Sequence, residues 1–599
     1  MKETNPESDP DAEPDETGRR WAMERRRLLQ ATGAGLGSFS LIGFGGDVAT
    51  AQTGCADGPF ERTYVGGSIN MGQIRAEEAR GTTPSDVGAA TPPSAATEPA
   101  DGHQPPRKAA QESNADADGP LTVHAEYDGV TAEDTRGAVP SDSQVAAGNG
   151  KILHALNQQV AIYNKRSGQR EQMVRLERLW EPVIDEPEGG FAYGYPFVFD
   201  PRARYDRNED RFVVCAVQYE PGLTTDGEIV DREELEEGAD PRDGEEGEDE
   251  VSEDDAETEL SRPPRGWWMV AVSATSNPNG KWYVYRVPPI TNEGLVDYPT
   301  LGLDRDAIYL TQNFFGEQFE VTMATLDKAA MYDGDAVTGH HFTGMHNPDP
   351  DAPFTFTVQP ALQPFSGGSS GSYYLVNSGF VSNALTLWEV TDPVGDPDLA
   401  CHTVEVGPYS GPPAAEQPGT DARIDTLGTR LMNADYDDGS LWTAHTVGYD
   451  WTGDGDRVAA VRWYEIDVAT RSLVQSGVYG EPNTSYFIPT VNADDGETVV
   501  VHNVSGPDTY PRMDVAGRTA DAPAGELEDA VVVEEGKSSY DYGEGSDVMR
   551  WGDYNGAAVD PITGRFWTVS QYSPDVEIPP EADERDPYYT RIAEVFFEE

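Results

Sequence analysis

The 599-residue chain is poor in cysteine, in lysine and in long apolar runs. Its three cysteines, Cys55, Cys215 and Cys401, are too few and too scattered for a disulfide scaffold or a zinc cluster. Cys215 and Cys401 could form one bridge, or they could be two small buried apolar side chains. Seven lysines contribute to the 42 basic residues, against 107 acidic ones. This balance excludes nucleic-acid binding as the leading function.

Acidic residues are spread over the whole chain and give it a formal net charge of -65. Such a charge repels itself in dilute buffer, whereas molar salt shortens the Debye length to ~3 Å and screens the repulsion. The composition resembles that of proteins from halophiles that accumulate salt. A solvating acidic tail on an ordinary protein would not spread the acidic residues so widely, and we therefore predict a halophilic protein.

The N-terminal segment predicts export. Arg25, Arg26 and Arg27 precede Leu28 and Leu29 and then a weakly apolar, glycine-rich run, which resembles a twin-arginine signal. The run is too short and too rich in glycine to be a membrane-spanning helix.

A cleavage signal follows this run. Ala49 and Ala51 form an A-x-A-like site, and Thr53-Gly54-Cys55 resembles the end of a lipobox, although Gln52 replaces the expected Leu. We predict a secreted or cell-surface protein, with Cys55 as a candidate for lipid attachment.

Composition divides the chain into three parts. We assign residues 1–55 to the signal region, residues 56–118 to a disordered spacer and residues 119–599 to the folded domain. The spacer is built of Ala, Pro, Gly, Ser, Thr and acidic residues and has too little apolar surface to bury. The acidic segment 222–266 interrupts strand-like sequence and predicts a disordered insertion in a surface loop, with ion binding as a minor alternative.

The folded domain shows an all-β pattern, with one short helical stretch near residues 326–333. A unit recurs roughly seven times: a strand of small and apolar residues ending near an Asp, a polar turn, and a second strand with aromatic residues. YPTLGLDRDAIYLTQNFF and NGAAVDPITGRFWTVSQY are examples. We predict a seven-bladed β-propeller, with a β-solenoid or two sandwiches as alternatives. The early strand LTVHAEY is expected to complete the last blade.

Two turns, SNPNGKW at 276–282 and DPITGRFW at 560–567, resemble degenerate Asp-boxes. Each places a glycine after a polar corner and an aromatic residue shortly beyond it. Such boxes are folding devices on outer turns, and we assign them no active-site role.

Several motifs in one order carry a family resemblance. Asp134-Thr135, the hairpin VFDPRARYDRNEDRFVV, Asp297-Tyr298-Pro299, His445-Thr446 and RWGDYNGAAVDPITGRFW resemble a family of exported propeller-like proteins of bacteria and archaea. The resemblance covers residues 134–597. It implies a propeller fold and export, and it brings no settled activity.

The segment RWGDYNGAAV supplies the main candidates for ligand contact. Residues 555–559 are small enough for an innermost strand, where blades crowd the channel. Arg550 and Asp553 then lie where inner strands begin, at the channel mouth, and Trp551 and Trp567 pack between blades. We predict no catalytic residue. The predicted ligand-binding residues are Arg550, Asp553, Tyr554, Asp297, Tyr298, Arg462, His445 and Asp134.

A sialidase-like glycoside hydrolase is the alternative function. That chemistry needs an Arg cluster for a carboxylate, an Asp that acts as the general acid and a Tyr activated by a Glu. The last blades contain such residue types without a defining spacing, namely Arg423, Arg430, Arg462 and Arg550 with Asp425, Asp553, Tyr464, Glu465 and Tyr554.

Metal binding has two modest candidates. Asp450, Asp454 and Asp456 lie on a glycine-bearing loop that is similar to calcium loops but lacks their full twelve-residue pattern. The second candidate, an irregular loop with three His, has no H-E-x-x-H spacing and consists of His340, His341 and His346. Ca²⁺ is therefore the one candidate cofactor.

Together these features predict an exported, monomeric, halophilic β-propeller that binds an extracellular glycan, an envelope component or another protein. Glycoside hydrolysis is the second hypothesis, and a purely structural spacer or adhesin is the third. The fold does not name the ligand, because propellers carry many unrelated sites.

Overall fold

The structure is a computed structural model. It describes residues 54–78, 121–135, 140–187, 190–192, 195–224, 229–230, 260–290, 293–316, 318–349, 353–362, 371–379, 383–541, 548–575 and 588–598. The predicted signal residues Arg25, Arg26 and Arg27 lie outside this part of the chain.

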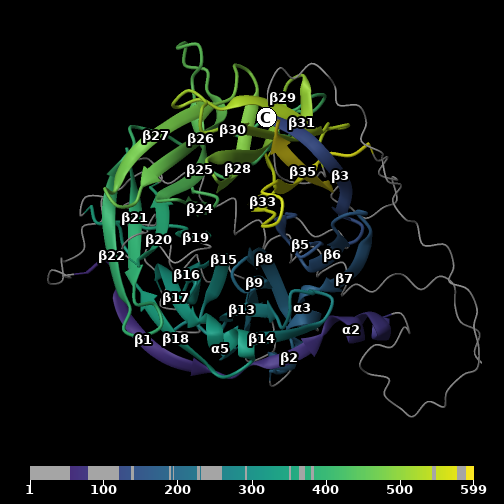
Figure 1. Cartoon of the computed structure of the whole chain (residues 1–599), viewed down its shortest axis with the longest axis vertical. Helices are drawn as coiled ribbons and strands as arrows, with labels where there is room; N and C mark the ends of the chain where they lie inside the picture. Colours follow the sequence, from purple (N-terminus) through teal and green to yellow (C-terminus); the bar gives the residue numbers. More distant parts are fainter. Residues whose placement is uncertain are drawn as a thin grey trace, which may run out of the picture.

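The described strands pair antiparallel in seven successive sets, which Figure 1 shows arranged in a ring. The first three sets are β4 (Gln144–Gly148), β5 (Lys151–Leu156), β6 (Gln159–Asn164) and β7 (Arg170–Arg175); β8 (Phe197–Asp206), β9 (Arg211–Glu220), β13 (Arg265–Ser273) and β14 (Lys281–Val287); and β15 (Leu295–Leu303), β16 (Ala307–Phe315), β17 (Phe319–Asp327) and β18 (Val337–Thr343).

The fourth and fifth sets are β19 (Gln359–Leu362), β20 (Tyr373–Ser378), β21 (Ala384–Thr391) and β22 (Asp398–Glu405); and β24 (Ala434–Asp437), β25 (Ser440–Tyr449), β26 (Val458–Asp467) and β27 (Ser472–Tyr479). The last two are β28 (Ser485–Asp494), β29 (Glu497–Gly506), β30 (Thr509–Arg518) and β31 (Glu528–Glu534); and β33 (Gly556–Val559), β34 (Phe566–Tyr572), β35 (Tyr589–Phe597) and β3 (Leu121–Thr131).

The ring is closed by β3, which pairs with β35 from the other end of the chain. This pairing confirms the predicted role of LTVHAEY, and the all-β propeller is confirmed over the solenoid and the sandwiches. Parallel pairing of β15 with β19 and of β19 with β24 joins three sets into one 13-stranded sheet. The number of blades therefore stays a prediction.

Aspartates explain why the inner hairpins turn where they do. Asp304 follows β15, and its Oδ1 accepts the backbone N–H groups of Asp306 and Ala307, both at 2.9 Å. Asp560 follows β33 and its Oδ1 accepts the N–H of Ile562 at 3.0 Å. A short carboxylate that satisfies turn N–H groups ends the strand and starts the return, which is the physical basis of the repeat seen in the sequence. Of the two Asp-box-like turns, 276–282 lies on an outer hairpin between β13 and β14, whereas 560–565 lies on the inner hairpin between β33 and β34.

Polar side chains near the inner strands form a belt of hydrogen bonds that links every set to the next. At least one side-chain hydrogen bond forms each link, so the belt fixes the spacing of the blades as well as satisfying buried polar groups. The links are Arg202 Nε to Pro299 O (2.9 Å), Thr300 Oγ1 to Val358 O (3.1 Å), Gln359 Nε2 to Leu431 O (2.8 Å), Asn433 Nδ2 to Val491 O (2.7 Å), Thr490 Oγ1 to Asn555 O (3.0 Å), Gln144 Nε2 to Asn555 O (2.7 Å) and Arg204 Nη1 to Gln144 Oε1 (2.7 Å).

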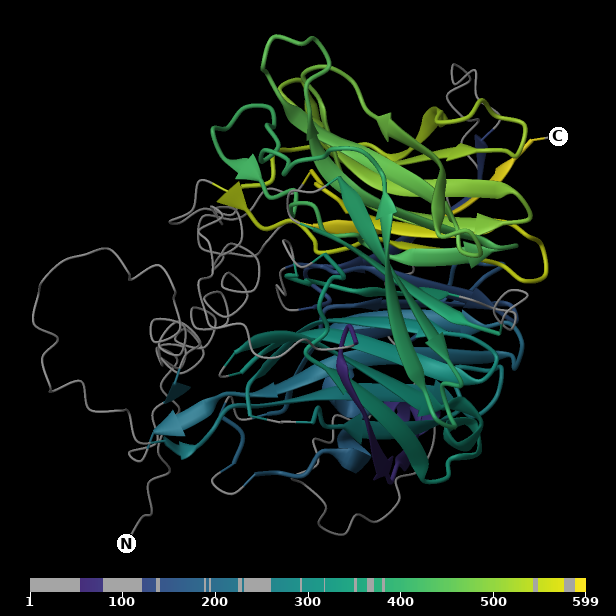
Figure 2. The same cartoon turned by 90° about the vertical axis from the view of Figure 1, so that its left-hand side faces the viewer.

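Residues 57–78 form a strap across the outside of the ring. β1 (Asp57–Tyr64) pairs with β18 and β2 (Gly67–Asn70) pairs with β14, as Figure 2 shows for the purple strand β1. The helix α2 (Met71–Glu78) follows and buries Met71 and Ile74. The prediction that 56–118 is a disordered spacer is therefore wrong for this stretch, because free outer edges of two sheets supply the partners that the composition did not suggest. Residues 79–118 lie outside the described part.

A disulfide joins Cys55 to Cys401, and Cys215 is a buried free cysteine. The predicted alternative of a Cys215–Cys401 bridge is wrong. The bond also occupies the Cys55 sulfur, so the predicted lipid attachment at Cys55 is not compatible with this structure. The signal region assigned to 1–55 thus ends in a residue that the folded ring uses.

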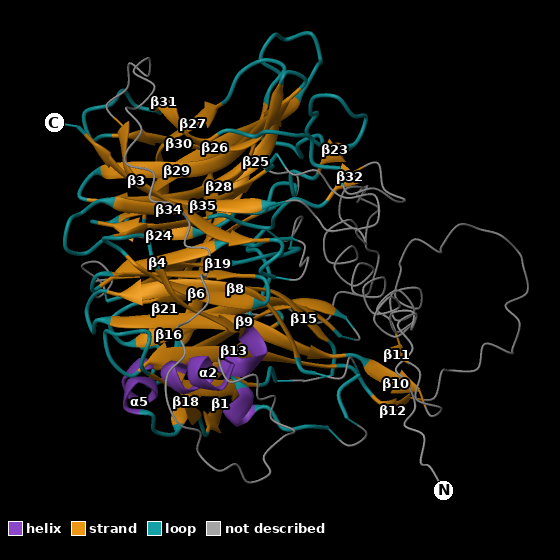
Figure 3. Ribbon diagram, turned by 90° about the vertical axis from the view of Figure 1, so that its right-hand side faces the viewer, coloured by secondary structure: helices purple, strands orange, loops and turns teal. Residues whose placement is uncertain are grey.

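The acidic insertion 222–266 begins and ends in strands. The prediction that this whole segment is disordered is therefore wrong at both of its ends. β10 (Gly222–Thr224), β11 (Ile229–Val230) and β12 (Leu260–Arg262) form a small sheet, and β13 starts at Arg265. Figure 3 shows this sheet projecting from the same face as the pair β23 (Arg423–Ile424) and β32 (Val548–Met549). The remaining helical elements are α3 (Leu176–Leu179), the 3₁₀ turn η2 (Glu181–Val183) and α5 (Lys328–Asp333), the last at the predicted position. No described helix has the length and apolar character needed to cross a membrane.

Candidate ligand-binding site

The backbone at the start of several inner strands is held in the left-handed region without glycine. This conformation costs non-glycine residues about 1 kcal/mol or more and is concentrated at functional or tightly constrained positions. The register of β8, β15 and β28 shifts at the same place, which is typical of a β-bulge. The residues concerned are Asp142, Asp200, Tyr298, Thr357 and Ile488, with φ between 49° and 53°.

Two buried aspartates connect these bulges across the mouth. Asp142 Oδ1 accepts the backbone N–H of Asp553 at 2.7 Å, and Asp200 Oδ2 accepts that of Tyr298 at 3.2 Å. Asn157 lies between them, since it donates to Asp142 and accepts the N–H of Asp200 at 2.8 Å. The carboxylates thus fix the backbone of neighbouring inner strands.

Arg202 is stacked between two of the predicted site residues. Its Cζ lies 3.2 Å from the ring centroid of Tyr554 and 4.9 Å from that of Tyr298. The Tyr554 hydroxyl donates to Pro201 O and the Tyr298 hydroxyl to Asp553 O, both at 3.0 Å. Both hydroxyls are therefore engaged with main-chain carbonyls, and the arginine charge is stabilised by two aromatic faces.

Arg550 and Asp553, which the sequence placed at this mouth as ligand contacts, form an ion pair with each other. Arg550 donates to the carboxylate of Asp553, and its Nη1 lies 3.5 Å from Asp425 Oδ2. Both Arg550 and Asp553 are buried, at 6% and 4% exposure. A buried pair of this kind holds the loop before β33 against the loop around β23.

Proton affinities in this mouth cluster follow from burial. Burial and then the nearby Asp553 raise the pKa of Asp142 well above its usual range. Burial, Asp142 and Asp297 do the same for Asp200. Burial raises the pKa of Tyr298 to about 12. At neutral pH the cluster therefore tends to keep protons that exposed carboxyl groups would release.

The structure brings Arg550, Asp553, Tyr554, Asp297 and Tyr298 together at the mouth. The other three predicted ligand-binding residues lie elsewhere. Arg462 donates to Pro408 O at 2.6 Å, and His445 contacts Thr429 O and the Tyr464 hydroxyl at 2.7 and 2.9 Å. Burial lowers the pKa of His445 to about 3, so this imidazole is a neutral packing residue. Asp134 lies in the turn after the outer strand β3, where Arg170 donates to it at 2.8 Å.

The candidate calcium loop folds around its own carboxylate. Asp450 accepts the N–H groups of Thr452, Gly453 and Gly455, and these hydrogen bonds, above all the one from Gly455, lower the pKa of its carboxyl group. Asp454 likewise accepts the N–H of Asp456 at 3.1 Å. This arrangement does not turn the carboxylates toward a common cation, and the calcium site stays a prediction.

The histidine candidate shows no metal geometry either. His340 and His341 are consecutive residues of β18 and so point to opposite faces, and His341 contacts the Tyr64 hydroxyl. Across the described ranges, no three His, Cys, Asp or Glu side chains could together hold a metal ion.

Sequence reasoning missed Asp142, Asp200 and Arg202 at this mouth. A signal was present: in Asp200-Pro201, Tyr298-Pro299 and Ile488-Pro489 a proline follows the left-handed residue. A polar residue stands directly after the proline in all three cases, namely Arg202, Thr300 and Thr490, and each is a member of the inter-blade belt. The pattern becomes visible only once the inner strands are superimposed.

Comparison with known proteins gives no family. No family model matches the chain, and no curated protein matches it. Among solved structures, the RRP9 WD40 repeats align with 80% of this chain and 98% of theirs, at 9% identity and a TM-score of 0.30. Apo AztD from Citrobacter koseri aligns with 66% of this chain and 73% of its own, at 12% identity and 0.25. A glycoside hydrolase aligns with 50% of this chain and 59% of its own, at 12% identity and 0.25. The propeller assignment therefore rests on the strand pairing itself.

Proposed function

We propose that this protein is an exported β-propeller, adapted to high salt, that binds an extracellular carbohydrate, envelope component or protein at its channel mouth. One observation carries the proposal: a line of aromatic and arginine side chains leads from the surface to the mouth cluster.

The surface end of this line is Phe354, which is 49% exposed. Phe319 is the first residue of β17, and its ring centroid lies 5.5 Å from that of Phe354 and 5.6 Å from that of Phe356. Arg430 Cζ then lies 5.0 Å from the Phe356 ring and 5.1 Å from the Tyr298 ring. Flat aromatic faces beside a fixed guanidinium suit the apolar face of a sugar ring or a partner side chain.

Glycoside hydrolysis is less well supported by the same geometry. A sialidase-like mechanism needs a tyrosine hydroxyl activated by a carboxylate and a proton donor facing the substrate. Tyr554 and Tyr298 instead donate to backbone carbonyls, and Asp553 is paired with Arg550. These groups stabilise the ring, whereas Phe354 presents about half of its side chain at the surface.

Export is part of the proposal and has independent support. The Cys55–Cys401 disulfide suits an oxidising compartment, where such bonds form and persist. The twin-arginine-like segment begins about 30 residues upstream of Cys55, and that pathway suits a protein whose two chain ends must pair before use. The net charge of -65 suits an environment of high salt.

The test is a glycan-array and fluorogenic-glycoside screen of residues 54–599 in molar salt, since the strap is part of the fold. Binding that is lost in Phe354→Ala and retained in Ile562→Ala supports the proposal. Ile562 is a matched control because it is 75% exposed on the opposite, inner-hairpin side of the ring. Turnover that disappears in Asp553→Asn would establish the hydrolase instead, and binding unaffected by Phe354→Ala would overturn the assigned surface.

A further inference from the structure

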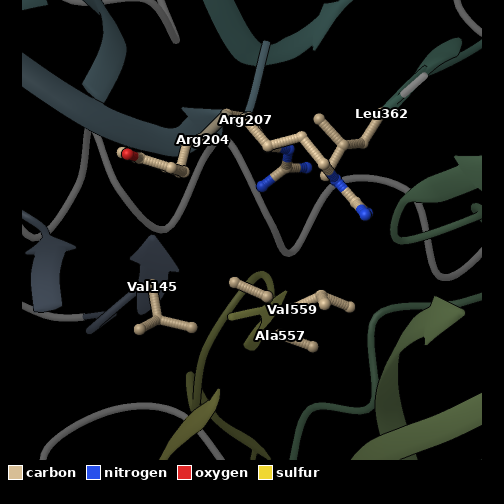
Figure 4. A pocket seen from close by; sticks show the side chains of 8 residues that line it. Val145, Arg204, Arg207, Leu362, Ala557 and Val559 are labelled. Carbon is tan, nitrogen blue, oxygen red and sulfur yellow. The ribbon is translucent and has the colours of Figure 1, made fainter. Parts of the chain in front are cut away.

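The channel contains a small cavity toward the far end of the inner strands. Inner strands of four sets line it, through Val145 of β4, Leu362 of β19, residues 557–559 of β33, and Arg204 with Arg207 at the end of β8 (Figure 4). Its volume is about 20 Å³, which is room for a single species about the size of a water molecule. No sugar or side chain fits such a space.

Arg204 brings a charge into this cavity, and the carboxylate that acts on it, Asp435, does not line the cavity. The residue is 9% exposed, and its Nη1 donates to Gln144 Oε1 at 2.7 Å and to Ala203 O at 3.0 Å. Its Nε is buried and has no hydrogen-bond partner. Among the described residues, no Asp or Glu forms an ion pair with Arg204.

The surroundings of Arg204 increase the free energy needed to keep its buried guanidinium charged. Burial and then the neighbouring positive charge of Arg202 lower the pKa of Arg204 to about 10. A buried cation whose acceptors are neutral is expensive unless a counter-charge is present. An orphaned buried donor also indicates a bound water or ion.

The two walls of the cavity differ in character. Arg207 lines it on the same side as Arg204 and also binds Asp494, with 2.9 Å between Nη1 and Oδ1. Ala557, Ala558 and Val559 line the opposite side and present no acceptor side chain. Among the described residues, two guanidinium groups thus line the cavity and no carboxylate does, while Asp494 and Asp435 act on these arginines from outside the lining.

We propose that this cavity binds one small monovalent anion, chloride by its size, held by Arg204 with Arg207 against the small side chains of β33. A water molecule would accept the Nε hydrogen bond but would not neutralise the guanidinium. Sulfate, phosphate and carboxylates are too large for the volume. The site lies beyond the ligand surface proposed above and is independent of it.

The first test measures thermal unfolding of residues 54–599 at constant ionic strength while gluconate replaces chloride. We expect a Tm about 3 °C higher in chloride, the shift for a ligand at roughly 100 times its Kd acting on a ring of this size. Arg204→Gln should remove the difference. Arg471→Gln should retain it, because Arg471 forms an exposed ion pair with Glu389 and lies outside the cavity.

Equal Tm values of the wild-type protein in chloride and in gluconate would overturn the proposal. The same difference in Tm between the two salts in Arg204→Gln and in Arg471→Gln would also overturn it, because it would report a general salt effect. A second measurement does not depend on a variant that folds. Crystals of the wild-type protein grown in bromide should show an anomalous peak beside Arg204, and a cavity without such a peak at molar bromide would also overturn the proposal.

Discussion

The disulfide between Cys55 and Cys401 allows a direct test of the strap. The bond closes a loop with a sequence separation of 346 residues. Chain entropy alone gives an upper limit of about 6 kcal/mol for a loop of this length, and measured values for native disulfides are typically about 2–4 kcal/mol. For a ring of this size, 1 kcal/mol moves Tm by about 1 °C, so Cys401→Ser should lower Tm by about 2–4 °C.

Removing the disulfide should destabilise the strap before it destabilises the whole ring. Without the bond, the strap is held by the pairing of β1 with β18, the pairing of β2 with β14, the burial of α2 and a few hydrogen bonds such as that from Arg62 to Ile290 O at 3.0 Å. Hydrogen exchange at molar salt should therefore speed up first at residues 57–70, while the inner strands remain protected.

The controls distinguish the effect of losing the disulfide from the effect of replacing a cysteine side chain. A reductant should reproduce the loss in the wild-type protein and have no further effect on Cys401→Ser. Cys215→Ala keeps the disulfide and should leave exchange at the strap unchanged. An unchanged Tm in Cys401→Ser, with unchanged exchange at 57–70, would refute the view that the bond holds the strap.

Three further predictions follow from charge and packing. Lowering salt from molar to ~0.1 M should lower Tm, because carboxylate repulsion then acts over ~10 Å. Gly556→Leu should cost at least about 1–3 kcal/mol in unfolding free energy, since even a Cβ at Gly556 would lie 2.6 Å from Val145 N. Burial raises the pKa of Asp435 from 3.8 to about 7, so the folded state binds this proton more tightly than the unfolded state. Stability should therefore fall as pH rises from about 4 to 7, by up to about 4 kcal/mol from this group, and Asp435→Asn should remove that part of the pH dependence.

Each of these has its own check. Differential scanning fluorimetry across a salt series tests the first, and a flat Tm would contradict the halophile argument. Chemical unfolding tests the second, with Gly564→Leu for comparison because a Cβ there meets nothing within 4 Å, although its φ of 68° adds backbone strain. Unfolding at pH 5 and pH 8 tests the third. An equal slope in Asp435→Asn and wild type would show that Asp435 is ionised in the folded state.

The repeat could be predicted because its signals are local. Asp304 and Asp560 end inner strands by binding N–H groups two or three residues away, and the small residues of β33 match the crowding beside β4. The position of Arg550 and Asp553 near the start of an inner strand could also be predicted, because it follows from the run of small residues just after them, but their pairing with each other was not predicted.

The remaining site residues could not be found in this way. Asp142 binds the N–H of Asp553, and Arg202 stacks on Tyr554, across separations of 411 and about 350 residues. His445 and Arg462 were placed at the mouth because they lie in a late blade, but they belong to the second and third strands of that blade and not to its inner strand.

The sequence by itself determined the strand pattern, the acidic surface charge and the order of the inner hairpins, because turn chemistry, composition and period-two alternation act within a few residues. The tertiary structure alone decided which distant segments of the chain contact one another. Cys55 pairs with Cys401 and not with Cys215, the strap completes two sheets, and aspartates from different blades gather at one mouth. Ring closure brings residues hundreds of positions apart into contact, and no local pattern encodes which edge or thiol a distant segment will find.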